Sequence, residues 1–232
     1  MNPGWRLRRH ASLPSTNDLC VTLAQSGEPE GLAILADRQT AARGSRGRTW
    51  VSPPGALCLS VLLRPREPAA ESGHWALLAA LALHDALAPL APLTLKWPND
   101  LLIGGRKLGG ILLDAATSPA GLDWLVIGFG ANLGDAPDGA GALAADPATI
   151  APAILAQIDA WRRVRALSGW SPIRAAWLAR AHPAGTPVRV RAGGSEIAGA
   201  FDGLADNGAL LLRADGRVHT VSTGDILLAE HA

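Results

Sequence analysis

A cationic, glycine-bearing segment is the strongest chemical signal in the chain. Residues 43–48 read Arg-Gly-Ser-Arg-Gly-Arg, so three arginines fall within six positions. Glycine lets backbone N–H groups approach an anion closely, and each guanidinium can hold carboxylate or phosphate oxygens in a fork. Trp50 follows, and its flat ring could stack on a nucleobase. A solvated surface loop is the alternative reading. The segment lies between two apolar runs in a chain of net charge +1, however, which favours an anion-binding loop.

A second polar segment follows an apolar run at residues 93–97. Lys96 closes that run, and Pro98 turns the chain away from a sheet before Asn99 and Asp100. The Asp100 carboxylate could hold Mg²⁺ directly or through water, because hard cations prefer oxygen ligands. The same residues also suit an ordinary hairpin turn, and the pattern alone leaves both readings open.

Lysine is rare in this sequence. Of the 21 basic residues, Lys96 and Lys107 are the two lysines, and the other 19 are arginine. A strong arginine bias replaces lysine wherever either residue serves, so a retained lysine is a candidate for a place that needs a compact ammonium. Gly109 and Gly110 follow Lys107 and would permit close approach of a ligand. An edge lysine followed by a turn is the alternative.

Two further segments carry short polar groups. Residues 128–132, Gly-Phe-Gly-Ala-Asn, follow an apolar run but lack the G-x-G-x-x-G spacing of a dinucleotide loop. Ser15, Thr16 and Asn17 precede a helical pattern and suit a helix cap, with Asp18 three residues after Ser15. The same three side chains could recognise a neutral hydrogen-bonding ligand, and the two roles are compatible.

Composition narrows the class of protein. With 232 residues, 48% hydrophobic and 18% charged, the chain is typical of a soluble globular protein with one large and one small domain. The near-zero net charge gives no global attraction to nucleic acid. Cys20 and Cys58 lie in apolar runs, which favours buried reduced thiols and a cytoplasmic protein. No secretory signal is evident, and the longest apolar run, residues 75–83, is too short to span a membrane.

The elements that must position these residues can be read from hydrophobic periodicity and turn signals. Strands are predicted at residues 31–36, 56–63, 93–97, 101–103, 108–115 and 124–129. Helices are predicted at residues 15–26, 72–87, 149–167 and 171–181. This order predicts an α+β fold, in which helices pack on a mixed-sheet catalytic domain over residues 1–184. Short alternating runs separated by Asn-Gly and Asp-Gly turns then predict a small SH3-like β-barrel over residues 185–232.

Taken together and in order, these segments closely resemble the biotin protein ligase family. The matching stretches are residues 15–17, 39–50, 96–100, 106–112 and 128–132. The likeness covers nearly the whole chain, because the small C-terminal barrel is also a feature of that family. It implies an enzyme that uses ATP to form biotinyl-5′-AMP and then transfers biotin to a lysine of a biotin carboxyl carrier protein. Biotin, ATP and Mg²⁺ are the implied ligands.

The resemblance also implies a role for each matching residue. Lys107 and Arg43 are the implied catalytic groups, and Asp100 is the implied Mg²⁺ contact, direct or through water. The implied biotin-binding residues are Ser15, Thr16, Asn17, Gln39, Arg43, Gly44, Ser45 and Lys107. The implied ATP- and adenylate-binding residues are Arg46, Arg48, Trp50, Lys96, Asn99, Asp100 and Asn132.

The chain departs from the family pattern at two positions of the arginine segment. Ala42 stands where the family usually has glycine, and Ser45 stands where it usually has a second arginine. Ser45 removes a full charge, so we hypothesise that the adenylate is held less tightly, or that Arg46 or Arg48 compensates. Family members that repress transcription carry an N-terminal helix-turn-helix module. Because the match here begins almost at Met1, we expect no operator binding.

Three alternatives remain open. A lipoate or octanoate ligase is the nearest, although its ligand would need a long apolar tunnel instead of polar partners. A nucleic-acid-binding module using residues 43–48 is the alternative from another class, and acidic residues in the C-terminal part argue against it. A degenerate homologue without activity is disfavoured by the presence of Lys107 and Asp100. Both a monomer and a homodimer are compatible with the sequence.

Overall fold

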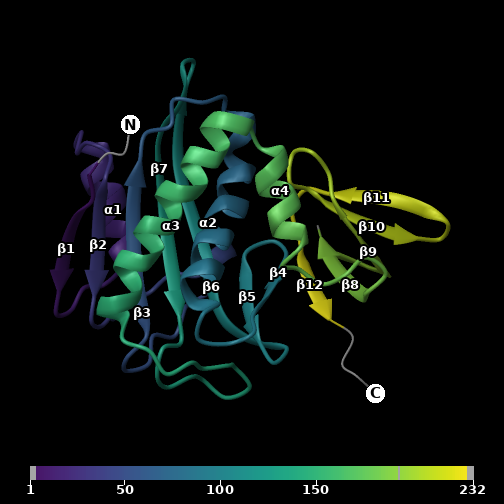
Figure 1. Ribbon diagram of the computed structural model, residues 1–232, viewed down its shortest axis with the longest axis horizontal. Helices are drawn as coiled ribbons and strands as arrows, with labels where there is room; N and C mark the ends of the chain where they lie inside the picture. Colours follow the sequence, from purple (N-terminus) through teal and green to yellow (C-terminus); the bar gives the residue numbers. More distant parts are fainter. Residues whose placement is uncertain (1–3, 193, 229–232) are drawn as a thin grey trace.

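The computed structural model describes residues 4–192 and 194–228 and contains two sheets (Figure 1). The larger sheet has seven strands in the order β1-β2-β3-β7-β6-β5-β4. Its strands are β1 (Arg6–His10), β2 (Leu32–Ala36), β3 (Leu57–Leu63), β4 (Thr94–Lys96), β5 (Asp100–Ile103), β6 (Arg106–Ser118) and β7 (Gly121–Ala131). The β1–β2 pair is parallel and the other pairs are antiparallel, so the sheet is mixed, as predicted.

Two helices, α2 (Ser72–Leu87) and α3 (Pro147–Ser168), cover one face of this sheet, and α4 (Ser171–Leu178) packs against both of them. Their apolar side chains pack on every second residue of the central strands. In β3 these residues are Leu57, Leu59, Val61 and Leu63. In β7 they are Leu125, Ile127, Phe129 and Ala131. A two-residue period is what a strand imposes on one face of a sheet, and here it forms the main hydrophobic core.

A single helix, α1 (Thr16–Gln25), packs on the opposite face. Ser15 is its N-cap, and the Ser15 hydroxyl accepts a hydrogen bond from the Asp18 N–H at 3.2 Å, as predicted from the sequence. Cys20 and Ala24 of α1 pack with a smaller apolar group that includes Leu62. Because α1 is only 10 residues long, it covers part of this face and leaves the neighbouring part open for a site.

The second sheet is antiparallel, with five strands in the order β11-β10-β9-β8-β12. These are β8 (Pro187–Ala192), β9 (Ser195–Leu204), β10 (Leu210–Ala214), β11 (Arg217–Val221) and β12 (Asp225–Leu228). It lies beside β4 and α4, at the end of the large sheet remote from β1 (Figure 1). The Trp97 indole donates to the Gly208 carbonyl at 3.1 Å and links the two parts. The boundary predicted between residues 184 and 185 falls in the segment between α4 and β8, and it stays a prediction.

The sequence does not predict strand β1, because its residues, Arg-Leu-Arg-Arg-His, carry almost no apolar signal. It is an edge strand whose pairing with β2 is made by backbone groups, and its Leu7 side chain is 40% exposed. The end predicted for α4 at residue 181 is also too late, since the helix ends at Leu178.

Both cysteines are buried and free, as predicted. Burial raises the pKa of the Cys20 thiol to about 12, which keeps it protonated near neutral pH. Over residues 4–192 and 194–228, every helix is too short or too polar to cross a lipid bilayer.

Candidate active site

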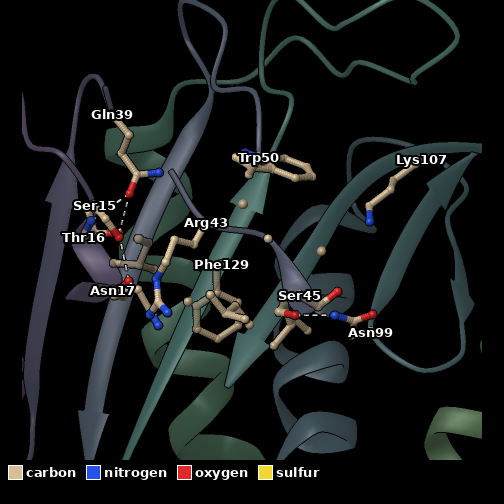
Figure 2. A pocket seen from close by; sticks show the side chains of 18 residues that line it. Ser15, Thr16, Asn17, Gln39, Arg43, Ser45, Trp50, Asn99, Lys107 and Phe129 are labelled. Carbon is tan, nitrogen blue, oxygen red and sulfur yellow. Dashed lines mark hydrogen bonds between the residues drawn. The ribbon is translucent and has the colours of Figure 1, made fainter. Parts of the chain in front are cut away.

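A pocket opens on the face of the large sheet that α1 leaves uncovered. Ten of the fifteen residues given an implied catalytic or binding role line it: Ser15, Thr16, Asn17, Gln39, Arg43, Gly44, Ser45, Trp50, Asn99 and Lys107. Figure 2 shows Gln39 and residues 15–17 gathered at one end and Lys107 with Asn99 at the other, with Trp50 between them. Segments that are far apart in the sequence therefore meet at one cavity.

The floor of the pocket is made from residues that lack bulk. Ser60 of β3 pairs with Gly128 of β7, and Gly128 pairs with Leu112 of β6. Two residues further along β7, Gly130 pairs with Gly110. A Cβ atom at Gly128 would lie 2.7 Å from Asn17 Oδ1, and one at Gly130 would lie 3.0 Å from the Trp50 ring. The glycines that resemble a weak nucleotide loop therefore make room for two side chains of the site.

At one end of the pocket, neutral polar groups form a connected hydrogen-bond network. The Thr16 hydroxyl and the Ser60 hydroxyl lie 2.8 Å apart, and Ser60 donates to Asn17 Oδ1 at 3.2 Å. Gln39 Oε1 accepts a hydrogen bond from the Thr16 N–H at 2.7 Å. Asn17 is only 4% exposed, and its amide donates to the Asp114 carboxylate. Buried polar groups that are satisfied in this way are held in fixed orientations, ready to recognise a ligand with matching donors and acceptors.

The arginine segment forms a small hairpin over the pocket. The Gly44 N–H donates to the Arg48 carbonyl at 2.7 Å, and the Trp50 N–H donates to the Ala42 carbonyl at 3.0 Å. Arg43 lines the cavity, where its guanidinium pairs with Asp18 and with Asp114, at 2.7 Å each. The guanidinium of Arg43 therefore lies at the cavity, where two carboxylates of the protein engage it, and its expected role in binding an anion stays a prediction.

Lys107 supplies the cation at the other end of the pocket. Its ammonium pairs with Asp100, and it lies 5.7 Å from the centre of the Trp50 ring. Lys96 pairs with the other oxygen of Asp100 at 3.1 Å. One carboxylate is thus shared by two ammonium groups, so this cluster carries a net positive charge close to the cavity.

The donors around Asp100 do not form a ready cation site. Both of its carboxylate oxygens are paired with lysines, and a divalent ion would have to displace one of them. Among residues 4–192 and 194–228, no group of three or more His, Cys, Asp or Glu side chains is placed to hold a metal ion. The Mg²⁺ contact implied for Asp100 therefore stays a prediction.

Several residues expected at the nucleotide lie outside the cavity lining. Lys96 and Asp100 belong to the charged cluster beside it. Asn132 is 2% exposed, and its amide donates to the Gly141 carbonyl at 2.9 Å. The Asn132 side-chain oxygen is buried and receives no hydrogen bond from the residues that the structure describes. Arg46 and Arg48 instead pair with Asp225 of β12, at 2.9 Å and 3.5 Å.

Sequence reasoning missed three polar residues of the site. Ser60 is the polar residue in the otherwise apolar strand β3. An isolated hydroxyl in a buried strand was the signal that could have marked it as a site residue. Asp114 and Asp18 both contact Arg43, but neither stands out in the sequence, because an acidic residue in a strand or a first helical turn is common. Their role depends on the hairpin being folded against them.

Comparison with known proteins identifies this architecture. The model of the biotin/lipoate A/B protein ligase family matches residues 10–132, and the model of the biotin protein ligase C-terminal domain matches residues 184–228. The chain is 39% identical over 223 residues to a biotin–[acetyl-CoA-carboxylase] ligase of Paracoccus denitrificans, covering 88% of this chain and 92% of that one. It is 35% identical over 248 residues to the enzyme of the same name from Mycobacterium tuberculosis, covering 97% and 90%.

Solved structures agree on the fold. A biotin protein ligase from Aquifex aeolicus, determined in complex with biotin and ATP, superimposes with a TM-score of 0.82 at 24% identity. The match covers 97% of this chain and 99% of that one. The SH3-like expectation for the small sheet agrees with the match to the C-terminal domain model. With both domains matched and two relatives above 30% identity along nearly their full length, the chain belongs to the biotin protein ligase family.

Proposed function

We propose that this protein activates biotin with ATP and attaches it to a lysine of a biotin carboxyl carrier protein, a subunit of acetyl-CoA carboxylase. Membership of the family and the names of its relatives support this activity. The observation that carries it in the structure is one pocket with two chemically different ends, neutral hydrogen-bonding groups at one and cations at the other. The predicted cytoplasmic location and the choice between monomer and homodimer stay predictions.

The neutral end suits the ureido ring of biotin. This ring has two N–H donors and one strong carbonyl acceptor, and it carries no charge. Ser15, Thr16, Asn17 and Gln39 offer hydroxyl and amide groups around the cavity in a network whose members are already hydrogen-bonded. Binding can therefore be selective with little reorganisation of the protein. Gly44 and Ser45 would cover the bound ligand from the hairpin side.

The cationic end would receive the biotin carboxylate and the nucleotide. Lys107 would lie between the carboxylate and the α-phosphoryl group, with Arg43 approaching from the hairpin. Trp50 offers a ring face for adenine beside Gly130. Asn99, Asp100, Lys96 and the buried oxygen of Asn132 supply polar groups for the rest of the nucleotide. The nucleotide contacts implied for Arg46 and Arg48 would require both side chains to leave Asp225.

The chemistry joins two anions and then protects the product. A carboxylate oxygen of biotin attacks the α-phosphorus of ATP, the bond to the bridging oxygen breaks, and pyrophosphate leaves. Lys107 and Arg43 lower the barrier by stabilising the negative charge that builds up on the phosphoryl oxygens. The amine of the acceptor lysine then attacks the carbonyl carbon of biotinyl-5′-AMP, loses a proton and releases AMP. Between the two steps the hairpin must exclude water from the mixed anhydride.

The test is ATP-dependent transfer of labelled biotin to a biotin carboxyl carrier protein. We expect Lys107→Ala to lower the rate of adenylate formation about 10²- to 10³-fold, the range for loss of one preorganised group that stabilises developing charge. Arg106→Ala is the matched control, because Arg106 is the adjacent cation but is exposed and does not line the cavity. Its activity should stay near that of the wild type.

The ligand itself must also be tested, because the matching family model includes lipoate ligases. The protein is incubated with ATP and either biotin, lipoate or octanoate, and the acyl-adenylate is identified by mass spectrometry. Biotinyl-5′-AMP alone supports the proposal. Lipoyl or octanoyl adenylate without the biotinyl compound would overturn it.

A further inference from the structure

The arginine hairpin is held by carboxylates at both its base and its tip. At the base, Arg43 pairs with Asp18 and Asp114 of the large domain. At the tip, Arg46 Nη1 lies 2.9 Å from Asp225 Oδ2, and Arg48 Nη2 lies 3.5 Å from Asp225 Oδ1. Both oxygens of Asp225 are therefore engaged, each by a different arginine.

The carboxylate at the tip comes from the second sheet. Asp225 is the first residue of β12, and its backbone is fixed by pairing with Arg191 of β8. The turn before it, residues 222–224, lines a groove together with residues 43–47 of the hairpin. The C-terminal sheet therefore reaches the segment that must close over the proposed active site.

The backbone at the tip needs such a contact. Arg46 has φ +60°, in the left-handed region that favours glycine, and it lies within the short 3₁₀ turn Ser45–Gly47. The side chain of Arg48 supports this turn by donating to the Ser45 hydroxyl at 3.0 Å and to the Ser45 carbonyl at 3.3 Å. A non-glycine residue in this conformation persists where surrounding contacts fix it, and the Asp225 pair is such a contact.

We propose that Asp225 is a positioning residue that anchors the tip of the hairpin to the C-terminal sheet and so keeps Arg43 and Ser45 over the cavity. This inference rests on the proposed function only for the identity of the ligand that the hairpin covers. In this arrangement, the small sheet controls how long the activated intermediate remains enclosed. Arg46 and Arg48 act through Asp225, not as phosphate ligands.

The first experiment uses the ligand-free protein and needs no activity. Trypsin cleaves after arginine, so the rate of cleavage within residues 43–48 reports how often the hairpin leaves its closed position. We expect Asp225→Asn to raise this rate several-fold and Asp225→Glu to restore it towards the wild-type value. Asp202→Asn is the matched control, because Asp202 pairs with Arg213 within the same sheet, away from the hairpin.

The second experiment separates anchoring from direct nucleotide contact. The rate of labelled biotin dissociation and the rate of biotinyl-5′-AMP release are measured for Asp225→Asn, Arg46→Gln and the double variant. If the two residues act as a pair, each single variant raises the release rates, and the double variant is no worse than Asp225→Asn, which already loses both arginine contacts. The Arg46→Gln variant also serves if Asp225→Asn folds poorly.

Several outcomes would overturn the proposal. An unchanged rate of hairpin cleavage in Asp225→Asn, or an equal increase in Asp202→Asn, would show that Asp225 does not anchor the hairpin. Additive effects of Asp225→Asn and Arg46→Gln on release would mean that Arg46 contacts the nucleotide independently. A wild-type protein that forms no biotinyl-5′-AMP would instead refute the proposed function and leave the proteolysis result standing.

Discussion

The two faces of the large sheet are built from alternate residues of the same strands, yet they differ in character where α1 leaves one face uncovered. Towards α2 and α3, β3 and β7 present leucine, valine, isoleucine and phenylalanine in an unbroken core. Towards the pocket, the same two strands present Ser60, Gly128 and Gly130. The face covered by α2 and α3 therefore supplies the main core, and the uncovered part of the other face can carry small and polar residues that would weaken a core.

This division explains why the site is placed on strands rather than on loops alone. A strand fixes the direction of every second side chain, so the floor of the pocket is as rigid as the core behind it. The parts that must move belong to the hairpin above it. We therefore expect substitutions on the helix face to affect mainly the free energy of unfolding and substitutions on the pocket face to affect mainly ligand binding.

The largest effect is expected on the helix face. Leu81 of α2 is fully buried in the main core, so Leu81→Ala should lower the free energy of unfolding by about 2–5 kcal/mol through lost contacts and a cavity. Biotin affinity, measured below the unfolding transition, should be unchanged, because α2 lies across the sheet from the pocket. A loss of biotin affinity as large as the loss of stability would contradict this separation between the two faces. Chemical denaturation and isothermal titration calorimetry provide the two measurements.

The converse is expected at Gly128. The Cβ of Gly128→Ala would meet Asn17 Oδ1 at 2.7 Å and force it out of its hydrogen bonds with Ser60 and Asp114. We expect biotin binding, measured by the same calorimetry, to weaken by roughly 1–3 kcal/mol, about fivefold to 150-fold, with a smaller loss of unfolding free energy than in Leu81→Ala. Tight biotin binding by this variant would show that Asn17 does not recognise the ligand.

A smaller effect should follow from restoring charge to the hairpin. Ser45 lines the pocket as a neutral residue, so Ser45→Arg adds a guanidinium next to the proposed adenylate. Release of biotinyl-5′-AMP should slow by about fivefold, which corresponds to roughly 1 kcal/mol for a partly exposed charge pair. Ala42→Gly is the companion variant at the other departure from the family pattern. Identical release rates for wild type and Ser45→Arg would show that the missing charge does not loosen the intermediate.

The smallest effect concerns the free energy of unfolding at low pH, through Asp85 of α2. Burial alone would raise the pKa of Asp85, but its hydrogen bond with His84 and its pairing with Arg180 outweigh burial and lower that pKa. The stabilisation is therefore present above the unfolded pKa of about 3.9 and is lost as the pH falls through the folded value. In acid unfolding, Asp85→Asn should show a flatter pH dependence than wild type. Parallel curves would contradict this role.

Most of the fold is predictable, because burial imposes a period on the sequence. Helix α2 occupies residues 72–87 as predicted, since nearly all its sides are apolar. The central strands are predicted but too short, as β6 and β7 continue beyond their buried parts into a projecting hairpin (Figure 1). Strand β1 is not predicted from the sequence, because backbone pairing at a sheet edge requires no particular side chains.

The site is predictable as a set of residues but not as an arrangement. Unusual groupings, such as clustered arginines and two isolated lysines, mark candidate positions without any knowledge of contacts. Arg43 faces the pocket, whereas Arg46 and Arg48 turn towards Asp225. This difference depends on the geometry of the hairpin and on a carboxylate from the last strand, which no local pattern reveals.

The pairing of Arg43 with Asp18 and Asp114 has a consequence for the passage of ligands. While the hairpin is closed, the guanidinium between the two acidic side chains offsets one of their two negative charges. When the hairpin lifts, Arg43 leaves and both negative charges are uncovered, so the local electrostatic potential becomes more negative. The open hairpin therefore repels the anionic product AMP more strongly than the closed one does, which favours its departure.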